Sequence, residues 1–115
     1  MTDRRKANLL RGTVDLLILR ALAHEARHGY GISEWIEGAT GGELPMEEGT
    51  LYPALHRLEG KGWIAAEWGL SENNRRAKFY ELTPRGRDRL AKAAAEWRRY
   101  SDAVARALAA DPGEA

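Results

Sequence analysis

The fold of this chain is set by residues 50–68, which read TLYPALHRLEGKGWIAAEW. Proline lacks a backbone N–H and is tolerated in the first turn of a helix, so Pro53 predicts a helix with Thr50 as its N-cap. The apolar residues that recur at helical spacing predict its buried face: Leu51, Leu55 and Leu58. Two glycines, Gly60 and Gly62, follow the helix and precede an apolar run that is typical of a strand.

The opposite face of this helix carries small, polar and basic side chains: Thr50, Ala54, Arg57 and Lys61. A small aliphatic side chain can contact the methyl group of thymine, and an arginine can bond guanine through two hydrogen bonds. This face therefore predicts a helix that enters the DNA major groove, with Arg57 as the base-reading residue. A solvated helix face has the same composition, so the pattern alone fits both interpretations.

A basic hairpin is predicted after this helix, with strands over residues 63–68 and 77–82. Asn73 and Asn74, in the connecting segment, tolerate turn conformations. Three basic residues lie at or near the tip: Arg75, Arg76 and Lys78. They predict contacts with DNA phosphates.

Two helices are predicted before residue 50. The first has an apolar stripe at helical spacing: Leu10, Val14, Leu17, Ile18, Ala21 and Leu22. It is expected to stop near His28 and Gly29. The second is short, is ended by Gly41 and Gly42, and is marked by four residues: Ile32, Trp35, Ile36 and Ala39.

A long helix is predicted at the end of the chain, with Thr83 as N-cap and Pro84 at its first position. Its larger apolar residues recur every seven positions, with smaller companions between them: Leu90, Trp97 and Val104, then Ala94, Ser101 and Leu108. A seven-residue repeat is typical of paired helices, so we expect a dimer interface formed by Leu90, Trp97, Ser101, Val104 and Leu108.

The order of elements is helix, helix, helix, hairpin and long helix, without the strand and helix alternation of a parallel sheet. It predicts a mainly α, α+β fold, a winged helix-turn-helix with a β-hairpin wing and a long C-terminal dimerisation helix. We expect a basic N-terminal arm over residues 1–8, the DNA-binding domain over 9–83, the dimerisation helix over 84–111 and a tail over 112–115.

Composition limits the function classes. The chain has 115 residues, a formal net charge of +1 and no cysteine, which excludes disulfides, thiolate nucleophiles and iron–sulfur clusters. No signal sequence or membrane span is expected, so we expect a cytoplasmic protein without membrane contact, metal or cofactor. Positive charge is concentrated before residue 12 and between residues 75 and 89, whereas every charged residue from 33 to 49 is acidic.

Residues 24–28, HEARH, match the H-E-x-x-H pattern of zinc hydrolases. The pattern needs both histidines on one helical turn, and the glycines that follow His28 are expected to end the helix there. We therefore assign no enzymatic activity. A winged-helix module that contacts an acidic protein is a second alternative to DNA binding.

Four motifs, in order along the chain, resemble the PadR family of bacterial transcriptional regulators: HGYGI at 28–32, GTLYPALHRLE at 49–59, GWI at 62–64 and KFYELT at 78–83, with Gly86. The resemblance implies a homodimer, usually a repressor, that binds inverted-repeat operators in double-stranded DNA and is released by a small molecule. It implies DNA contacts from Thr50, Tyr52, Pro53 and Arg57 and from the wing residues Arg75, Arg76 and Lys78. Tyr52 is also compatible with packing against the core.

The resemblance also bears on the effector. In multidrug-sensing members, a tryptophan of the last helix meets its dimer mate and sandwiches flat aromatic ligands, and Trp97 stands at the matching position. Trp97 and Tyr100 are therefore the candidate contacts for a small aromatic or cationic effector. The wing sequence SENNRRAK at 71–78 resembles a subgroup often encoded beside permease genes.

Overall fold

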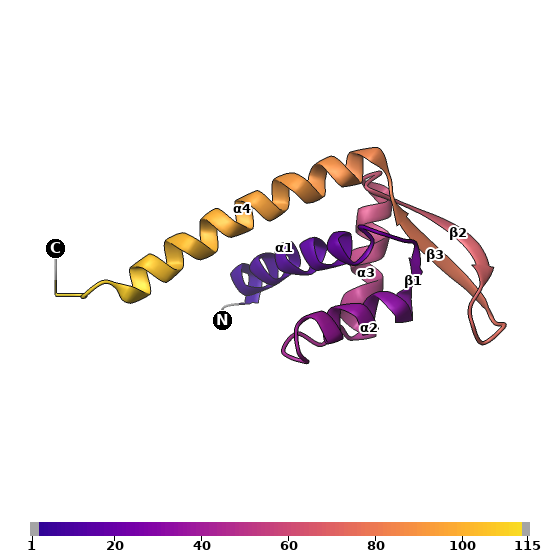
Figure 1. Ribbon diagram of the computed structural model, residues 1–115, viewed down its shortest axis with the longest axis horizontal. Helices are drawn as coiled ribbons and strands as arrows, with labels where there is room; N and C mark the ends of the chain where they lie inside the picture. The colour runs from indigo at the N-terminus through magenta and orange to yellow at the C-terminus, as the bar shows by residue number, and fades with distance from the viewer. Residues whose placement is uncertain (1–2, 114–115) are drawn as a thin grey trace.

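A computed structural model describes the backbone of residues 3–113 and the side chains of residues 12–113. The elements are α1 (Asp3–Ala21), β1 (Arg27–His28), α2 (Gly29–Ala39), α3 (Glu48–Gly60), β2 (Ile64–Leu70), β3 (Arg76–Leu82) and α4 (Pro84–Ala109) (Figure 1). The predicted α+β class, with three helices, a hairpin wing and a long last helix, is confirmed.

The core lies where α1, α2 and α3 meet the base of the hairpin. Its fully buried side chains are aliphatic and come from all four elements: Ile18, Leu19, Leu22, Ile32, Ile36, Leu51, Leu55, Leu58 and Ile64. The two apolar stripes predicted for α2 and α3 supply most of this cluster. Burial of apolar surface therefore fixes the position of α3 against α1 and α2.

The hairpin belongs to a three-stranded antiparallel sheet with the order β1-β3-β2, in which Ile64 faces Leu82 and Leu70 faces Arg76. The two strands are longer than predicted and leave residues 71–75 as the loop. Asn74 in this loop has a φ of 60°, as expected of a turn asparagine.

The first helix ends at Ala21, so the prediction that it continues to His28 is wrong. Arg27 Nε donates a hydrogen bond of 2.8 Å to the carbonyl of Ala21, at the end of the helix. Residues 27 and 28 then pair with β3 instead of continuing the helix, through Arg27 opposite Tyr80 and His28 opposite Phe79. Strand pairing of so short a segment depends on β3 and could not be recognised from the segment itself.

The third helix begins at Glu48, so the prediction of Thr50 as its N-cap is wrong. Pro53 lies inside the helix, beyond its first turn. The helical partner that its missing N–H leaves free is the carbonyl of Gly49, an exposed residue, so water can bond that carbonyl. Solvent access thus allows the proline to lie further into the helix than the first-turn rule predicts.

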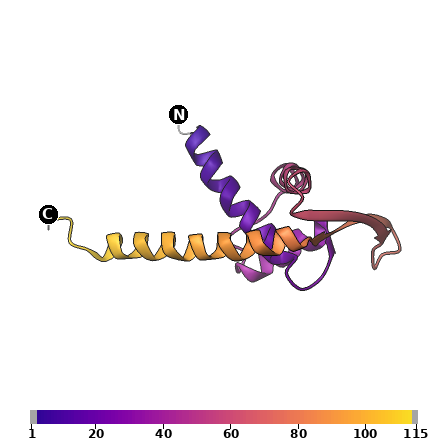
Figure 2. The same cartoon turned by 90° about the horizontal axis from the view of Figure 1, so that it is seen from above.

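The last helix begins as predicted. Thr83 is its N-cap, Pro84 is its first residue, and Thr83 Oγ1 accepts a 3.0 Å hydrogen bond from the Gly86 N–H. The helix has 26 residues, about 39 Å at 1.5 Å per residue. Its second half extends beyond the core (Figure 1). Seen from above, α1 and α4 diverge from each other as they leave the core (Figure 2).

Residues 3–8 of the predicted basic arm belong to α1, while residues 1–2 of that arm and residues 114–115 of the predicted tail lie outside the described residues. None of the helices in the described range has the length and apolar character needed to cross a membrane.

Candidate nucleic-acid interface

The exposed face of α3 is rotated relative to the predicted one. Four residues form the buried face at i, i+3, i+4 and i+7: Leu51, Ala54, Leu55 and Leu58. Ala54 is 1% exposed and belongs to the core, so the prediction that it faces outward is wrong. The three leucines alone do not define the buried face, because the small side chain of Ala54 fills its fourth position, where α3 packs closely on its neighbours. The exposed residues of α3 are Glu48, Gly49, Thr50, Tyr52, Pro53, His56 and Gly60.

Arg57 also differs from its predicted position. Its side chain is 25% exposed and forms an ion pair with Asp15 of α1, through Nη2 and Oδ1. Its Nε is buried and has no hydrogen-bond partner among the described residues. Arg57 therefore lies on the flank of α3 that packs toward α1, and the prediction that it points outward is wrong. The reason is the carboxylate of Asp15, which is distant in sequence and invisible to a helical-face pattern.

Tyr52 is both exposed, as a DNA contact requires, and packed against the protein, the two positions that the sequence left open. Its side chain is about half exposed, yet its ring packs over the first residue of α2, because a Cβ at Gly29 would lie 2.6 Å from Tyr52 Oη. Lys61 lies just past the end of α3, and its Nζ lies 4.8 Å from the centroid of the Trp63 ring. Pro53 and Thr50 are exposed as predicted.

His56 is an exposed residue of this face that the sequence analysis missed. It lies three and four residues after Pro53 and Tyr52 respectively, which is the spacing of neighbours on one helix face. That spacing was available in the sequence, but it is informative only once the orientation of α3 is known. Imidazole can donate and accept hydrogen bonds, so His56 adds a polar group to the centre of the exposed face.

The wing carries its basic residues in two settings. Arg75 in the loop and Arg76 at the start of β3 are exposed, and the Arg76 guanidinium carbon lies 5.0 Å from the centroid of the Trp68 ring. Lys78 is partly buried, and its Nζ lies 3.5 Å from the Glu59 carboxylate of α3. The arginines are thus free to meet a ligand, whereas Lys78 links the wing to α3.

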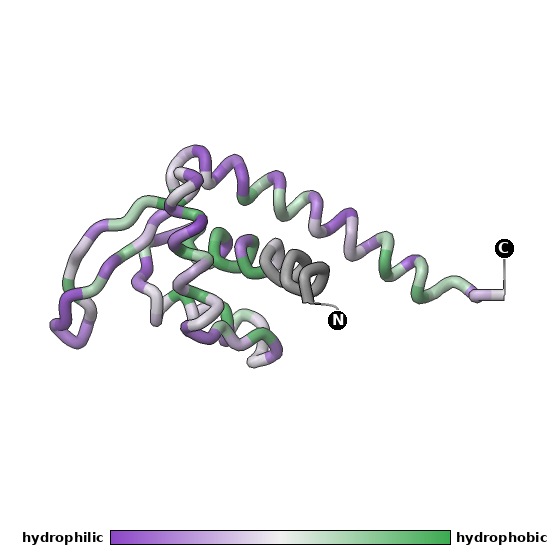
Figure 3. Tube along the Cα trace, turned by 180° about the vertical axis from the view of Figure 1, so that it is seen from behind, coloured by the Kyte–Doolittle hydropathy of each residue, from purple (hydrophilic) through white to green (hydrophobic). Residues whose placement is uncertain are grey.

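A groove of about 750 Å³ lies between the wing, the start of α2 and α3. Aromatic and basic side chains line it, among them Tyr30, Tyr52, Trp68, Arg75, Arg76 and Lys78, together with two acidic residues, Glu34 and Glu72. The hydrophilic loop at the tip of the wing stands out in the hydropathy view (Figure 3). A concave surface with exposed guanidinium groups beside a helix face is suited to a polyanion such as a nucleic-acid backbone.

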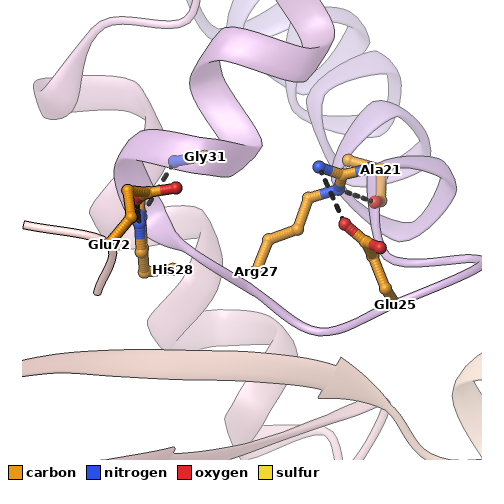
Figure 4. A network of polar contacts seen from close by, with 6 residues as sticks. All are labelled: Ala21, Glu25, Arg27, His28, Gly31 and Glu72. Atoms are coloured by element: carbon orange, nitrogen blue, oxygen red, sulfur yellow. Dashed lines mark hydrogen bonds and ion pairs between the residues drawn. The ribbon is translucent and has the colours of Figure 1, made fainter. Parts of the chain in front are cut away.

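The histidine motif forms no zinc site. His24 and Glu25 lie in the turn after α1, and Glu25 pairs with Arg27 at 3.5 Å (Figure 4). His28 belongs to β1, so the two histidines do not share a helical turn. Within the described residues, no group of three or more acidic or histidine side chains could hold a metal ion.

His28 instead connects α2 with the wing (Figure 4). Its Nδ1 accepts a 3.0 Å hydrogen bond from the Gly31 N–H, and its Nε2 lies 3.3 Å from Glu72 Oε1 in the wing loop. The hydrogen bond from His28 holds the pKa of the Glu72 carboxyl below its ordinary value. In β3, burial raises the pKa of the Tyr80 hydroxyl.

The predicted pairing stripe of α4 is largely exposed. Three residues of the stripe lie on the surface: Trp97, Val104 and Leu108, the last 82% exposed. Tyr100, the second candidate ligand contact, is also exposed. Ser101 is partly buried, and Leu90 packs partly buried against the core of its own chain. Apolar bands along the outer half of α4 are visible in Figure 3.

Trp97 and Tyr100 lie together, with ring centroids 5.9 Å apart. They border a shallow groove of about 270 Å³ between α1 and α4, together with Gly12, Leu16 and Ala93. The groove has a mainly apolar lining and is open to solvent. An exposed aromatic pair at such a groove can contact a flat ligand or an apolar face of another molecule.

Comparison with known proteins agrees with this geometry. Residues 18–92 match the model of the transcriptional regulator PadR-like family. A transcriptional regulator from Clostridium thermocellum has a similar structure, with a TM-score of 0.76 and 32% identity over 86% of this chain and 96% of that one. A PadR-like transcription factor from Bacteroides fragilis gives a TM-score of 0.75 and 29% identity over 90% and 98% of the two chains. A transcriptional regulator of Mycobacterium tuberculosis is 37% identical over 62 residues, 54% of this chain and 44% of that protein.

Proposed function

This chain belongs to the PadR-like family of DNA-binding transcriptional regulators, and we propose that it is a homodimeric repressor of inverted-repeat operators that a small molecule releases. Its relatives are transcription regulators and not enzymes. The observation that carries the proposal is the adjacency of an exposed α3 face and a basic wing across one groove. As a regulator of transcription, it would act in the cytoplasm.

We assign base contacts to the exposed residues of α3: Thr50, Tyr52, Pro53 and His56. Arg75 and Arg76 in the wing and Lys61 after α3 would contact phosphates, because their charged groups are exposed. Arg57 and Lys78 have carboxylate partners in α1 and α3. We therefore assign them the role of holding α3 and the wing in place for the other contacts.

A second copy of the chain is the proposed partner of α4. The exposed stripe of Trp97, Val104 and Leu108 is too apolar to favour contact with water along so much of one helix. A two-fold dimer would also present two copies of α3, which matches an operator made of two inverted half-sites. Leu90 would contribute at the inner end of this interface, where it already packs against its own core.

The proposed effector site is the groove bordered by Trp97 and Tyr100. A flat aromatic compound can stack on these rings, and a cationic one gains attraction from their π faces. The site adjoins the stripe proposed to pair with the second copy. A ligand there would therefore contact both the dimer interface and α1, the helix whose Asp15 pairs with Arg57 of α3.

The test is fluorescence anisotropy with a duplex selected from a randomised library by the wild-type protein, beside a scrambled duplex, at several salt concentrations. We expect a preference of about 1,000-fold or more for the selected duplex. Equal binding to both duplexes would overturn sequence-specific recognition, and binding to neither would favour a protein partner.

A matched pair of charge variants tests the assigned surface. Arg76→Ala should weaken binding to both duplexes and flatten the plot of log affinity against log salt by about 0.9. Lys92→Ala removes the same charge from the side of α4 opposite the apolar stripe and should leave that slope unchanged. Equal effects of the two variants would contradict the assignment of the wing.

A further inference from the structure

His28 lies at a joint of three elements. It is the last residue of β1, it is the N-cap of α2, and its ring meets Phe79 of β3 edge-on with centroids 5.3 Å apart. The side chain is 16% exposed, so these neighbours hold the ring in one orientation. The atom that remains directed at the wing loop is Nε2, 3.3 Å from Glu72 Oε1.

The hydrogen bonds of the ring define its tautomer. Nδ1 accepts from the Gly31 N–H, so Nδ1 carries no proton. A neutral imidazole with an unprotonated Nδ1 has its proton on Nε2, which makes Nε2 a donor to the Glu72 carboxylate. The bond that caps α2 therefore determines which ring atom is offered to the wing.

The wing loop is well bonded internally but has few ties to the helices. The Ser71 N–H donates to the Arg75 carbonyl at 2.9 Å, and the Asn74 N–H donates to the Ser71 carbonyl at 2.9 Å. In the described part of the chain, the Glu72–His28 contact is the hydrogen bond that joins loop 71–75 to the helical body. Its loss would let the loop move as a unit about the ends of β2 and β3.

Glu72 is also out of place on electrostatic grounds. It is 83% exposed and sits three residues before the exposed guanidinium of Arg75, on the surface assigned to DNA. A carboxylate there repels phosphates and lowers the affinity that the neighbouring arginines provide. A role in orienting the loop gives a physical reason for its presence.

We propose that His28 and Glu72 are positioning residues that hold the wing loop against the start of α2, so that Arg75 and Arg76 face the duplex in a defined relation to α3. The inference deepens the proposed function and rests on it. It differs from a DNA contact because neither residue needs to touch the nucleic acid.

Two substitutions at Glu72 separate position from charge. Glu72→Gln and Glu72→Ala remove the same negative charge, but glutamine keeps an oxygen that can accept from His28 Nε2 and alanine does not. Both variants should bind a scrambled duplex equally. Glu72→Ala should bind the selected duplex about three- to tenfold more weakly than Glu72→Gln, the range expected from one hydrogen bond.

His28→Asn provides the second arm. Asparagine is a favourable N-cap, so it can replace Nδ1 toward Gly31 while its short side chain cannot reach Glu72 as the ring does. Relative to wild type, His28→Asn should weaken binding of the selected duplex by the same factor that separates Glu72→Ala from Glu72→Gln, and the double variant should be no weaker than Glu72→Ala. Additive losses would overturn the proposal.

A measurement without DNA keeps the two proposals distinguishable. Backbone ¹⁵N relaxation should show lower order parameters for residues 71–75 in Glu72→Ala and His28→Asn than in wild type or Glu72→Gln. Equal order in all four proteins would overturn the positioning role even if the duplex selection succeeds. Failure of the wild type to select any duplex, with the loop loosened as expected, would instead overturn the proposed function.

Discussion

The ion pair between Arg57 and Asp15 leads to a sharp prediction, because it moves a residue that the sequence assigned to base reading into a structural role. Replacing Arg57 with methionine keeps an unbranched apolar stem and removes the guanidinium. Replacing Asp15 with asparagine keeps the shape of the side chain and removes the charge. Each change leaves one polar or charged partner half-buried between α1 and α3.

The expected cost follows from the burial of the pair. Breaking a fully buried ion pair costs about 3–5 kcal/mol of unfolding free energy, whereas exposed pairs contribute about 0–1 kcal/mol. The side chains of Arg57 and Asp15 are 25% and 17% exposed, so they lie between these limits. We expect each single variant to lose about 2 kcal/mol, and the double variant to lose about 1 kcal/mol less than the sum of the two single losses.

Urea denaturation at one fixed protomer concentration measures these values, because unfolding of the proposed dimer would depend on concentration. Arg20→Met is the control, since it removes an exposed arginine from α1 and should change the stability by less than about 0.5 kcal/mol. Strictly additive losses in the double variant would refute the energetic coupling.

The same variants decide between the two roles of Arg57. If Arg57 seats α3 on α1, Asp15→Asn and Arg57→Met should both weaken operator binding without a new preference at any base pair. If Arg57 reads a base, Arg57→Met should relax discrimination at one position, and Asp15→Asn should leave it intact. The second pattern would refute the structural reasoning.

Three further outcomes are expected. Gly86→Ala should severely destabilise the protein, by more than about 3 kcal/mol in urea denaturation, because its Cβ would lie 1.9 Å from the Trp63 carbonyl oxygen. Trp97→Arg should shift sedimentation from dimer to monomer, and a variant that stays dimeric would contradict the α4 interface. In NMR titration, the pKa of Glu72 should rise toward its ordinary value in His28→Asn; the depressed pKa contributes stability above the unfolded-state pKa that is lost as pH falls through the lower value, and an unchanged pKa would argue against the contact.

Local signals predicted the elements well where each depended on neighbouring residues. The Thr83 cap, Pro84, the leucine stripe of α3 and the isoleucines of α2 act within a turn or two of their own positions and appear as expected, whereas Ala39, at the end of α2, is exposed. The candidate DNA-binding surface was predicted in part. Thr50 and the wing arginines are exposed, but Ala54 and Arg57 are not on the outer face.

The sequence by itself determined the class and order of the elements, because helix caps, periodicity and turn residues act over short distances. Tertiary structure decided the rest: which face of α3 is outward, the pairing of β1 with β3, and the two side-chain links Asp15–Arg57 and His28–Glu72. These links join residues 42 and 44 positions apart in the chain. A helical wheel considers each residue only within its own helix, whereas the direction of Arg57 and the contact of His28 with Glu72 depend on residues that folding brings beside them.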